Sequence, residues 1–310
     1  MNPLKFLALT TLFVMPATFP LSSQDVHLSS GTVKHIEHFP SRFAAVRTVD
    51  VWLPDGYPEQ GKYAVLYMQD GQMLFDSSDT WNHQEWKVDE TAGRLMAERK
   101  VRDFIVVAVY NRSTLRHTDY FPQKPFSMLS KAEKDSVMKA KRPEGTPVFN
   151  AAVNSDEYLQ FLVTELKPWI DSSFSTDPGQ QATFIAGSSM GGLISLYAVC
   201  EYPGVFGGAA CLSTHWTGIF TTVDNPVPGV LLKYLKKHLP DPATHKFYFD
   251  HGTEGLDAMY GPTQAKVDRL MTRKGYGPDH WTTILYPGDN HTEKAWAGRL
   301  DKPLIFLFGK

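Results

Sequence analysis

The chain has 310 residues, of which 42% are hydrophobic and 21% charged, with 31 basic and 33 acidic side chains and a formal net charge of −2. These values are typical of a globular protein with a large core, and they exclude a chain that is disordered over most of its length. No basic tract stands out, so we expect no nucleic-acid partner.

The first residues have the pattern of a secretory signal. Lys5 supplies a positive charge, an apolar run extends from Phe6 to Met15, and prolines at 16 and 20 follow it. The run is too short to cross a bilayer as a helix. We therefore predict a signal peptide at 1–23 and a mature domain at 24–310, exported to the periplasm or secreted, with no stable membrane insertion. A buried N-terminal helix is the alternative.

Predicted strands and helices alternate along the rest of the chain. Apolar runs bounded by turn residues predict strands at 31–39, 44–54, 63–71, 103–111, 183–186, 205–214, 246–252 and 281–288. Helical spacing of apolar residues predicts helices at 86–100, 156–171, 193–203 and 262–276. This order predicts an α/β protein with a mostly parallel sheet between two layers of helices. In such sheets, sites form at the carboxyl ends of the strands.

Residues 112–154 interrupt this alternation. The stretch is long, polar and proline-containing, and it follows a predicted strand. Loops of this length are usually either functional or disordered. We predict a cap-like insertion beside the site, and a disordered surface insertion is the alternative.

The two cysteines, Cys200 and Cys211, both lie in apolar surroundings. Export would permit a disulfide, but the interpretation as buried small hydrophobes is favoured. Two cysteines without a tight histidine cluster give no zinc pattern, so no metal is expected.

The motif with the clearest chemistry is GSSMG, which spans residues 187–191 and matches G-x-S-x-G. An apolar strand precedes it and a helix pattern follows, which is the context of a nucleophile elbow. Such an elbow exposes the hydroxyl of Ser189 on a strained turn, and side chains at Gly187 and Gly191 would collide. The alternative is a glycine turn kept for tight packing.

A serine nucleophile needs a base. With this elbow the chain order is serine, acid, histidine, so the base must follow Ser189. His291 lies past the last predicted strand in a polar turn near the C-terminus, where a base can reach the serine. His215 and His251 also follow strands and are weaker candidates.

The acid should follow the strand at 246–252, where it would hold the imidazole in one tautomer. Glu254 is the first choice and Asp257 the alternative; a Ser–His pair working without either acid is also open. The oxyanion needs two backbone N–H donors. We expect them at Met190, directly after the nucleophile, and at Gln72, in the turn after the strand at 63–71.

Several segments together resemble the putative-esterase family of α/β-hydrolases, which includes enterobactin esterases, S-formylglutathione hydrolases, feruloyl esterases and mycolyltransferases. These segments are YMQDGQMLFD, WKVDE, GSSMGGLISLYAVCEYPGVFGGAACLS, FDHGTEGLD and GDNHTEKAW, in the family's order. The resemblance implies an α/β-hydrolase fold and esterase activity on Ser189 and His291. It is closest to the trilactone-siderophore esterase branch, where the acid can be dispensable. Related members often place a carboxylate two residues after the G-T pair, where this chain has Gly255. Arg116 and Tyr120 resemble a family segment near the substrate pocket.

The sequence thus predicts a serine esterase that forms an acyl-enzyme and needs no cofactor. Its expected partner is a small-molecule ester, either a siderophore-type lactone or another small ester. An acyltransferase using the same residues is the alternative, and a non-catalytic binding protein on the same scaffold is a third hypothesis. The oligomeric state is not predicted.

Overall fold

The computed structural model describes residues 26–59, 61–78 and 80–310. The signal peptide predicted at 1–23 lies outside the described residues. Within them, no helix combines the length and the apolar character that crossing a membrane requires.

An eight-stranded sheet forms the centre of the molecule, in the order β1-β2-β4-β3-β5-β6-β7-β8. The first two strands pair antiparallel with their neighbours, and the strands from β4 to β8 pair parallel. Its strands are β1 (Thr32–Phe39), β2 (Arg47–Leu53), β3 (Ala64–Gln69), β4 (Phe104–Val109), β5 (Thr183–Ser188), β6 (Gly208–Leu212), β7 (Lys246–Gly252) and β8 (Trp281–Tyr286). The prediction of a mostly parallel sheet is confirmed.

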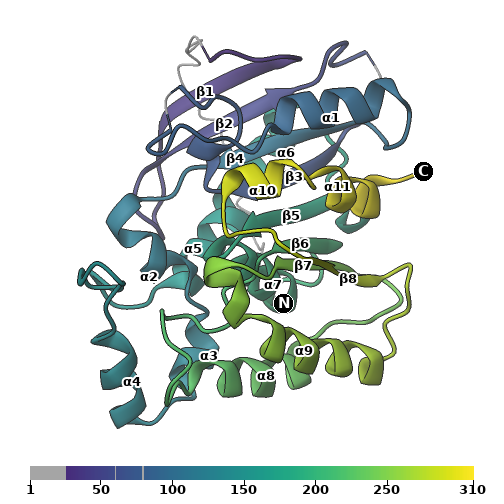
Figure 1. Ribbon diagram of the computed structural model, residues 1–310. Coiled ribbons are helices and arrows are strands. Elements are labelled where there is room, and N and C mark those ends of the chain that lie inside the picture. Colours follow the sequence, from purple (N-terminus) through teal and green to yellow (C-terminus); the bar gives the residue numbers. More distant parts are fainter. Residues whose placement is uncertain (1–25, 60, 79) are drawn as a thin grey trace, which may run out of the picture.

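Helices cover both faces of this sheet (Figure 1). They are α1 (Val88–Ala97), α2 (Arg116–Tyr120), α3 (Gln123–Ser127), α4 (Lys131–Met138), α5 (Ser155–Phe161), α6 (Lys167–Ser173), α7 (Met190–Glu201), α8 (Val227–His238), α9 (Gly261–Lys274), α10 (Glu293–Ala297) and α11 (Asp301–Phe308). Short turns lie at η1 (Gly71–Met73), η2 (Ser113–Leu115), η4 (Gln180–Ala182) and η5 (Gly255–Met259), and a π-helical turn, η3 (Leu162–Leu166), joins α5 to α6. The helix predicted at 156–171 is therefore one helical run with a π turn inside it.

Two hydrophobic clusters divide the core between the faces of the sheet. On one face, side chains of α1 and α11 pack against β3 and β4. On the other, side chains of α5, α7, α8 and α9 pack against the remaining apolar side chains of the sheet. The central strands β3, β4 and β5 are buried along their whole length. This explains why their sequences are continuous apolar runs rather than alternating ones.

Residues 112–154, predicted to be a cap-like insertion, include η2, α2, α3 and α4. Helix α2 is buried although it is polar, because its side chains find partners from distant elements. Asp119 forms a buried ion pair with Arg47, at 3.3 Å between Oδ2 and Nη2. The first part of the segment is thus anchored to the sheet. Figure 1 shows α2, α3 and α4 together along one side of the molecule.

Cys200 and Cys211 are free and buried, which agrees with the favoured interpretation of them as small hydrophobic side chains.

Candidate active site

Ser189 occupies a strained turn between β5 and α7. Its backbone has φ 57° and ψ −123°, a conformation that side-chain-bearing residues rarely adopt. Backbone hydrogen bonds hold the turn: the Ser189 N–H donates to the carbonyl of Leu212 at 2.9 Å, and its own carbonyl accepts from Leu193 at 3.1 Å. The residue is 8% exposed. The turn has the geometry that the G-x-S-x-G motif predicts.

The glycines of the motif are required by the crowding that was expected there. A Cβ at Gly187 would lie 2.7 Å from the backbone of Gly191, and a Cβ at Gly191 would lie 3.1 Å from the Cβ of Gln69. The first distance is shorter than real Cβ contacts allow, so the strand and the helix could not approach as they do. Small residues on both sides of Ser189 are therefore a condition of the turn.

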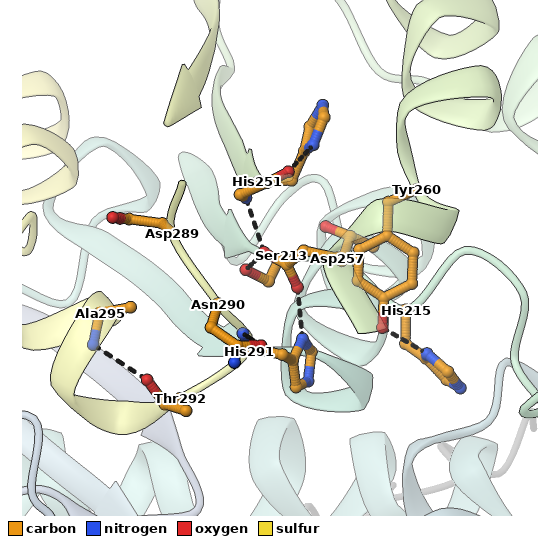
Figure 2. A network of polar contacts seen from close by, with 12 residues as sticks. Ser213, His215, His251, Asp257, Tyr260, Asp289, Asn290, His291, Thr292 and Ala295 are labelled. Atoms are coloured by element: carbon orange, nitrogen blue, oxygen red, sulfur yellow. Dashed lines mark hydrogen bonds and ion pairs between the residues drawn. The ribbon is translucent and has the colours of Figure 1, made fainter. Parts of the chain in front are cut away.

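His291 lies in the loop between β8 and α10, past the last strand. Its Nδ1 is 2.5 Å from Oδ1 of Asp257 (Figure 2). The edge of its ring packs against Trp296, with ring centroids 5.0 Å apart. Thr292 follows and caps α10, its side chain accepting from the Ala295 N–H at 3.3 Å. Helix α10 and the carboxylate thus fix the imidazole from two directions.

Asp257 is buried in η5 and surrounded by donors. Besides His291, its Oδ2 accepts from the Ser213 hydroxyl and from the Gly252 N–H, each at 2.6 Å. Burial alone would raise the pKa of Asp257, but the hydrogen bond and charge of His291 and the hydrogen bonds from Ser213 and Gly252 together lower it. Asp257 is therefore an ionised carboxylate well suited to stabilising an imidazolium.

Glu254, the first choice for the acid from the sequence, is exposed and faces Thr253, whose hydroxyl donates to it at 3.5 Å. The structure brings the alternative, Asp257, to His291 instead. The reason lies in the backbone between Glu254 and Asp257. Gly255 has φ +59°, and a Cβ there would lie 2.2 Å from Oδ1 of Asn290, the residue before His291. The glycine that departs from the family pattern thus lets the loop carrying His291 approach η5.

The two expected oxyanion donors lie at the starts of helical turns. Met190 is the first residue of α7, and Gln72 lies in the single turn of η1. Backbone N–H groups in a first turn have no partner within their own helix, so they can bind an anion. Gly71 permits this arrangement, because a Cβ there would lie 2.6 Å from the backbone of Ala108 in β4.

Asp70, directly before η1, is held by residues of the segment after β4. Arg116 donates from Nε to Oδ1 at 2.7 Å and from Nη2 to Oδ2 at 2.6 Å, and Asn111 donates to Oδ1 at 2.8 Å. The Asn111 N–H also donates to Oε1 of Gln72 at 3.2 Å. Two-point binding by a guanidinium is geometrically specific. Arg116, noted in the sequence as a residue near the pocket, therefore fixes the turn that carries one expected oxyanion donor.

Two further residues of the site, Ser213 and Tyr260, are not among those selected from the sequence. Ser213 immediately follows β6, at the edge of the sheet where sites form, so its position in the sequence could have marked it as a site residue. No comparable sequence feature marks Tyr260 as a site residue, since it lies in a turn before α9. Its ring edge packs against His291 with centroids 5.8 Å apart, and its hydroxyl interacts with the Ser189 side chain. Ser189 and His291 are thus neighbours of the same phenol.

Two weaker candidates for the base have other partners. His251 contacts the carbonyl of Gly252 through Nδ1 at 2.7 Å, and the His215 ring contacts the Tyr260 hydroxyl. Of the three histidines considered, His291 is the one that contacts a carboxylate in the described structure. A strained serine, an imidazole and an ionised carboxylate are the components of nucleophilic catalysis at a carbonyl.

Comparison with known proteins gives consistent results. The model of the family described as putative esterase matches residues 41–306. Protein YbbA of Bacillus subtilis, which is uncharacterized, is 21% identical over 275 residues, covering 86% of this chain and 94% of that protein.

Among solved structures, a ferulic acid esterase superposes with a TM-score of 0.63 at 18% identity, covering 90% of this chain and 98% of the other. The enterobactin esterase FES from Shigella flexneri superposes with a TM-score of 0.58 at 16% identity, covering 91% of this chain and 60% of the other. At such identities the likeness shows the fold alone, and the predicted α/β-hydrolase fold is confirmed.

Proposed function

The chain belongs to the putative esterase family, and from that premise we propose that it cleaves small carboxylic esters with Ser189, His291 and Asp257. Membership makes it a carboxylic ester hydrolase. The proposal concerns which residues act and how. The observation that carries it is the 2.5 Å contact of His291 with Asp257, together with the strained turn that holds Ser189.

In the first half of the reaction, Ser189 Oγ attacks the ester carbonyl while Nε2 of His291 takes its proton. The negative charge on the carbonyl oxygen is stabilised by the N–H groups of Gln72 and Met190. Asp257 stabilises the imidazolium and keeps Nδ1 protonated. His291 then gives its proton to the leaving alcohol as the ester bond breaks, and an acyl-enzyme remains.

In the second half, His291 removes a proton from water, which attacks the acyl carbonyl. The tetrahedral intermediate collapses when the bond to Ser189 Oγ breaks and His291 returns the proton to that oxygen. The acid leaves and the serine is regenerated. Every proton passes through one imidazole, so its orientation by Asp257 matters in both halves.

Hydrolysis of short-chain nitrophenyl esters tests this proposal. We expect Ser189→Ala to lower kcat at least about 10⁴-fold. Ser188→Ala is the matched control, because Ser188 is a buried neighbour in β5, and it should stay within about threefold of the wild type. Retention of wild-type activity by Ser189→Ala would end the proposal. Free acid as the main product in the presence of an alcohol acceptor supports hydrolysis over acyl transfer.

We propose that the substrate is a small ester, and two classes of ester should be assayed first. Feruloyl esters and a trilactone siderophore correspond to the names of structures that share the fold. The comparison of kcat/KM between these two and the nitrophenyl esters identifies the preferred class.

We also propose that the chain is exported, on the strength of the charged start and apolar run described above. Sequencing the N-terminus of the mature protein after expression with its leader tests this. A mature start close to residue 24 supports export, and an intact Met1 contradicts it.

A further inference from the structure

Tyr260 is a fully buried tyrosine whose hydroxyl lies among the residues of the proposed mechanism. It is 0% exposed. The hydroxyl is 2.7 Å from Nδ1 of His215 and interacts with the Ser189 side chain, while the ring edge packs on His291. Figure 2 shows Tyr260 between the rings of His291 and His215. The hydroxyl has one proton to donate, so it can donate a hydrogen bond either to His215 or to Ser189 but not to both.

His215 is fixed relative to Ser189 by the backbone as well as through Tyr260. Its N–H donates to the Ser189 carbonyl at 3.1 Å, and the residue is 1% exposed. The ring packs against Phe220 and His117, with centroids 5.2 and 6.1 Å away. The imidazole therefore has little freedom to turn.

The protonation of this pair follows from its burial. Burial lowers the pKa of His215 well below its usual range, and the nearby charges of His117, His291, Arg116 and Arg142 act in the same direction. The ring is therefore neutral and carries one N–H. Burial raises the pKa of Tyr260 well above its usual range, so the phenol keeps its proton.

The position of the single His215 proton follows from hydrogen-bond satisfaction. Nε2 of His215 has no hydrogen-bond partner among the described residues. A buried N–H without an acceptor is rarer in proteins than a buried acceptor without a donor. The proton is therefore on Nδ1, and Nδ1–H donates to the Tyr260 oxygen. The Tyr260 proton is left to point toward Ser189.

We propose, resting on the function above, that Tyr260 is a catalytic residue that donates a hydrogen bond to Ser189 Oγ, and that His215 is the positioning residue that directs this donor. Negative charge develops on Oγ when it attacks and again when it leaves the acyl-enzyme. A donor aimed at that oxygen stabilises both transition states more than the ground state. Tyr260 transfers no proton; the proton still moves through His291.

The test measures kcat and KM for a nitrophenyl ester in Tyr260→Phe, which removes only the hydroxyl. We expect kcat to fall on the order of 100-fold, as when one donor to a developing charge is removed, with KM within about threefold. Tyr276→Phe is the matched control, because Tyr276 is also buried and its hydroxyl donates to the carbonyl of Pro240 at 2.8 Å. The control should keep wild-type kcat.

Two substitutions at His215 test the positioning role. The side-chain amide of Asn can donate from nearly the place of Nδ1, so His215→Asn should retain most of kcat. His215→Leu should lose about as much as Tyr260→Phe, and the double variant His215→Leu/Tyr260→Phe should lose no more than either. Circular dichroism checks that each variant is folded.

The outcomes separate this proposal from the function on which it rests. If Tyr260→Phe keeps kcat within threefold while Ser189→Ala is inactive, the role of Tyr260 is refuted and the esterase mechanism stands. If His215→Asn is as impaired as His215→Leu, the positioning role is refuted. An active Ser189→Ala refutes the mechanism itself.

Discussion

The part of the chain that the structure describes contains two histidine–aspartate pairs, in different regions, with the same distance between nitrogen and oxygen. His291 and Asp257 meet at the carboxyl ends of the parallel strands, with Nδ1 and Oδ1 2.5 Å apart. His35 and Asp50 face each other across the antiparallel strands β1 and β2, also at 2.5 Å. Distance alone therefore does not identify the pair that takes part in chemistry.

The surroundings of the two carboxylates differ. Asp257 accepts from a serine hydroxyl and a backbone N–H as well as from the imidazole, and its pKa is lowered. Asp50 lies within a strand and accepts from the Tyr110 hydroxyl at 2.8 Å. Burial raises the pKa of Asp50, although Tyr110 and His35 act against this. In the first pair the donors around Asp257 favour its ionised form, and His291 packs against Tyr260. The second pair bridges two strands.

The largest expected difference between the pairs is in catalysis. His291→Ala should lower kcat at least about 10⁴-fold, since it removes the proposed base. His35→Ala should leave kcat within about threefold but destabilise the fold by about 3 kcal/mol, because it leaves Asp50 buried without its partner. Ester hydrolysis and urea unfolding measure the two effects. If both variants are folded and lose kcat equally, the distinction between a catalytic and a structural pair is contradicted.

A second comparison concerns the acid. Asp257→Asn should lower kcat on the order of 10³–10⁴-fold, because the imidazole loses the anion that orients and stabilises it. Glu254→Gln should change kcat less than about twofold, since Glu254 is exposed and faces Thr253. Steady-state kinetics with one nitrophenyl ester suffices. Full activity in both variants would support a serine–histidine pair acting without an acid.

The smallest expected effect is the pH dependence of stability, where the two carboxylates act with opposite sign. The pKa of Asp257 is lowered on folding, so its contribution is present above about pH 3.9 and is lost as the pH falls through the folded value. The pKa of Asp50 is raised, so the folded state binds more protons just above that pH and stability falls as the pH rises.

Urea unfolding between about pH 2 and 7 measures this contrast, because the contribution of Asp257 changes below about pH 3.9 and that of Asp50 changes above it. The difference in unfolding free energy between wild type and Asp257→Asn should grow as the pH rises to about 4 and then level off. The difference in unfolding free energy between wild type and Asp50→Asn should shrink as the pH rises above about 4. Slopes of the same sign for the two variants would contradict the contrast between the pairs.

Much of this site could be predicted from the sequence because its signals are local. The G-x-S-x-G motif contains the two glycines that the turn at Ser189 requires. The sequence also places His291 past the last strand. The choice between Glu254 and Asp257 could not be made locally. Both follow β7 and lie three residues apart, and the left-handed backbone at Gly255 decides which one turns inward.

Other features depend on contacts that are distant in the sequence. Helix α2 has the polar sequence RHTDY, yet it is buried because Arg47 from β2 pairs with Asp119. Helix α11 is short, and its place on the sheet follows from packing against α1. Tyr260 has no sequence signal, since its role depends on three residues from three other segments.

The central claim is that Ser189 is a nucleophile activated by His291. The most direct measurement is labelling with a fluorophosphonate, followed by mass spectrometry of the peptides. We expect one adduct per chain, on Ser189, formed much more slowly in His291→Ala and absent in Ser189→Ala. An adduct on a different residue, or an unlabelled Ser189 in an enzyme that hydrolyses esters, would contradict the claim.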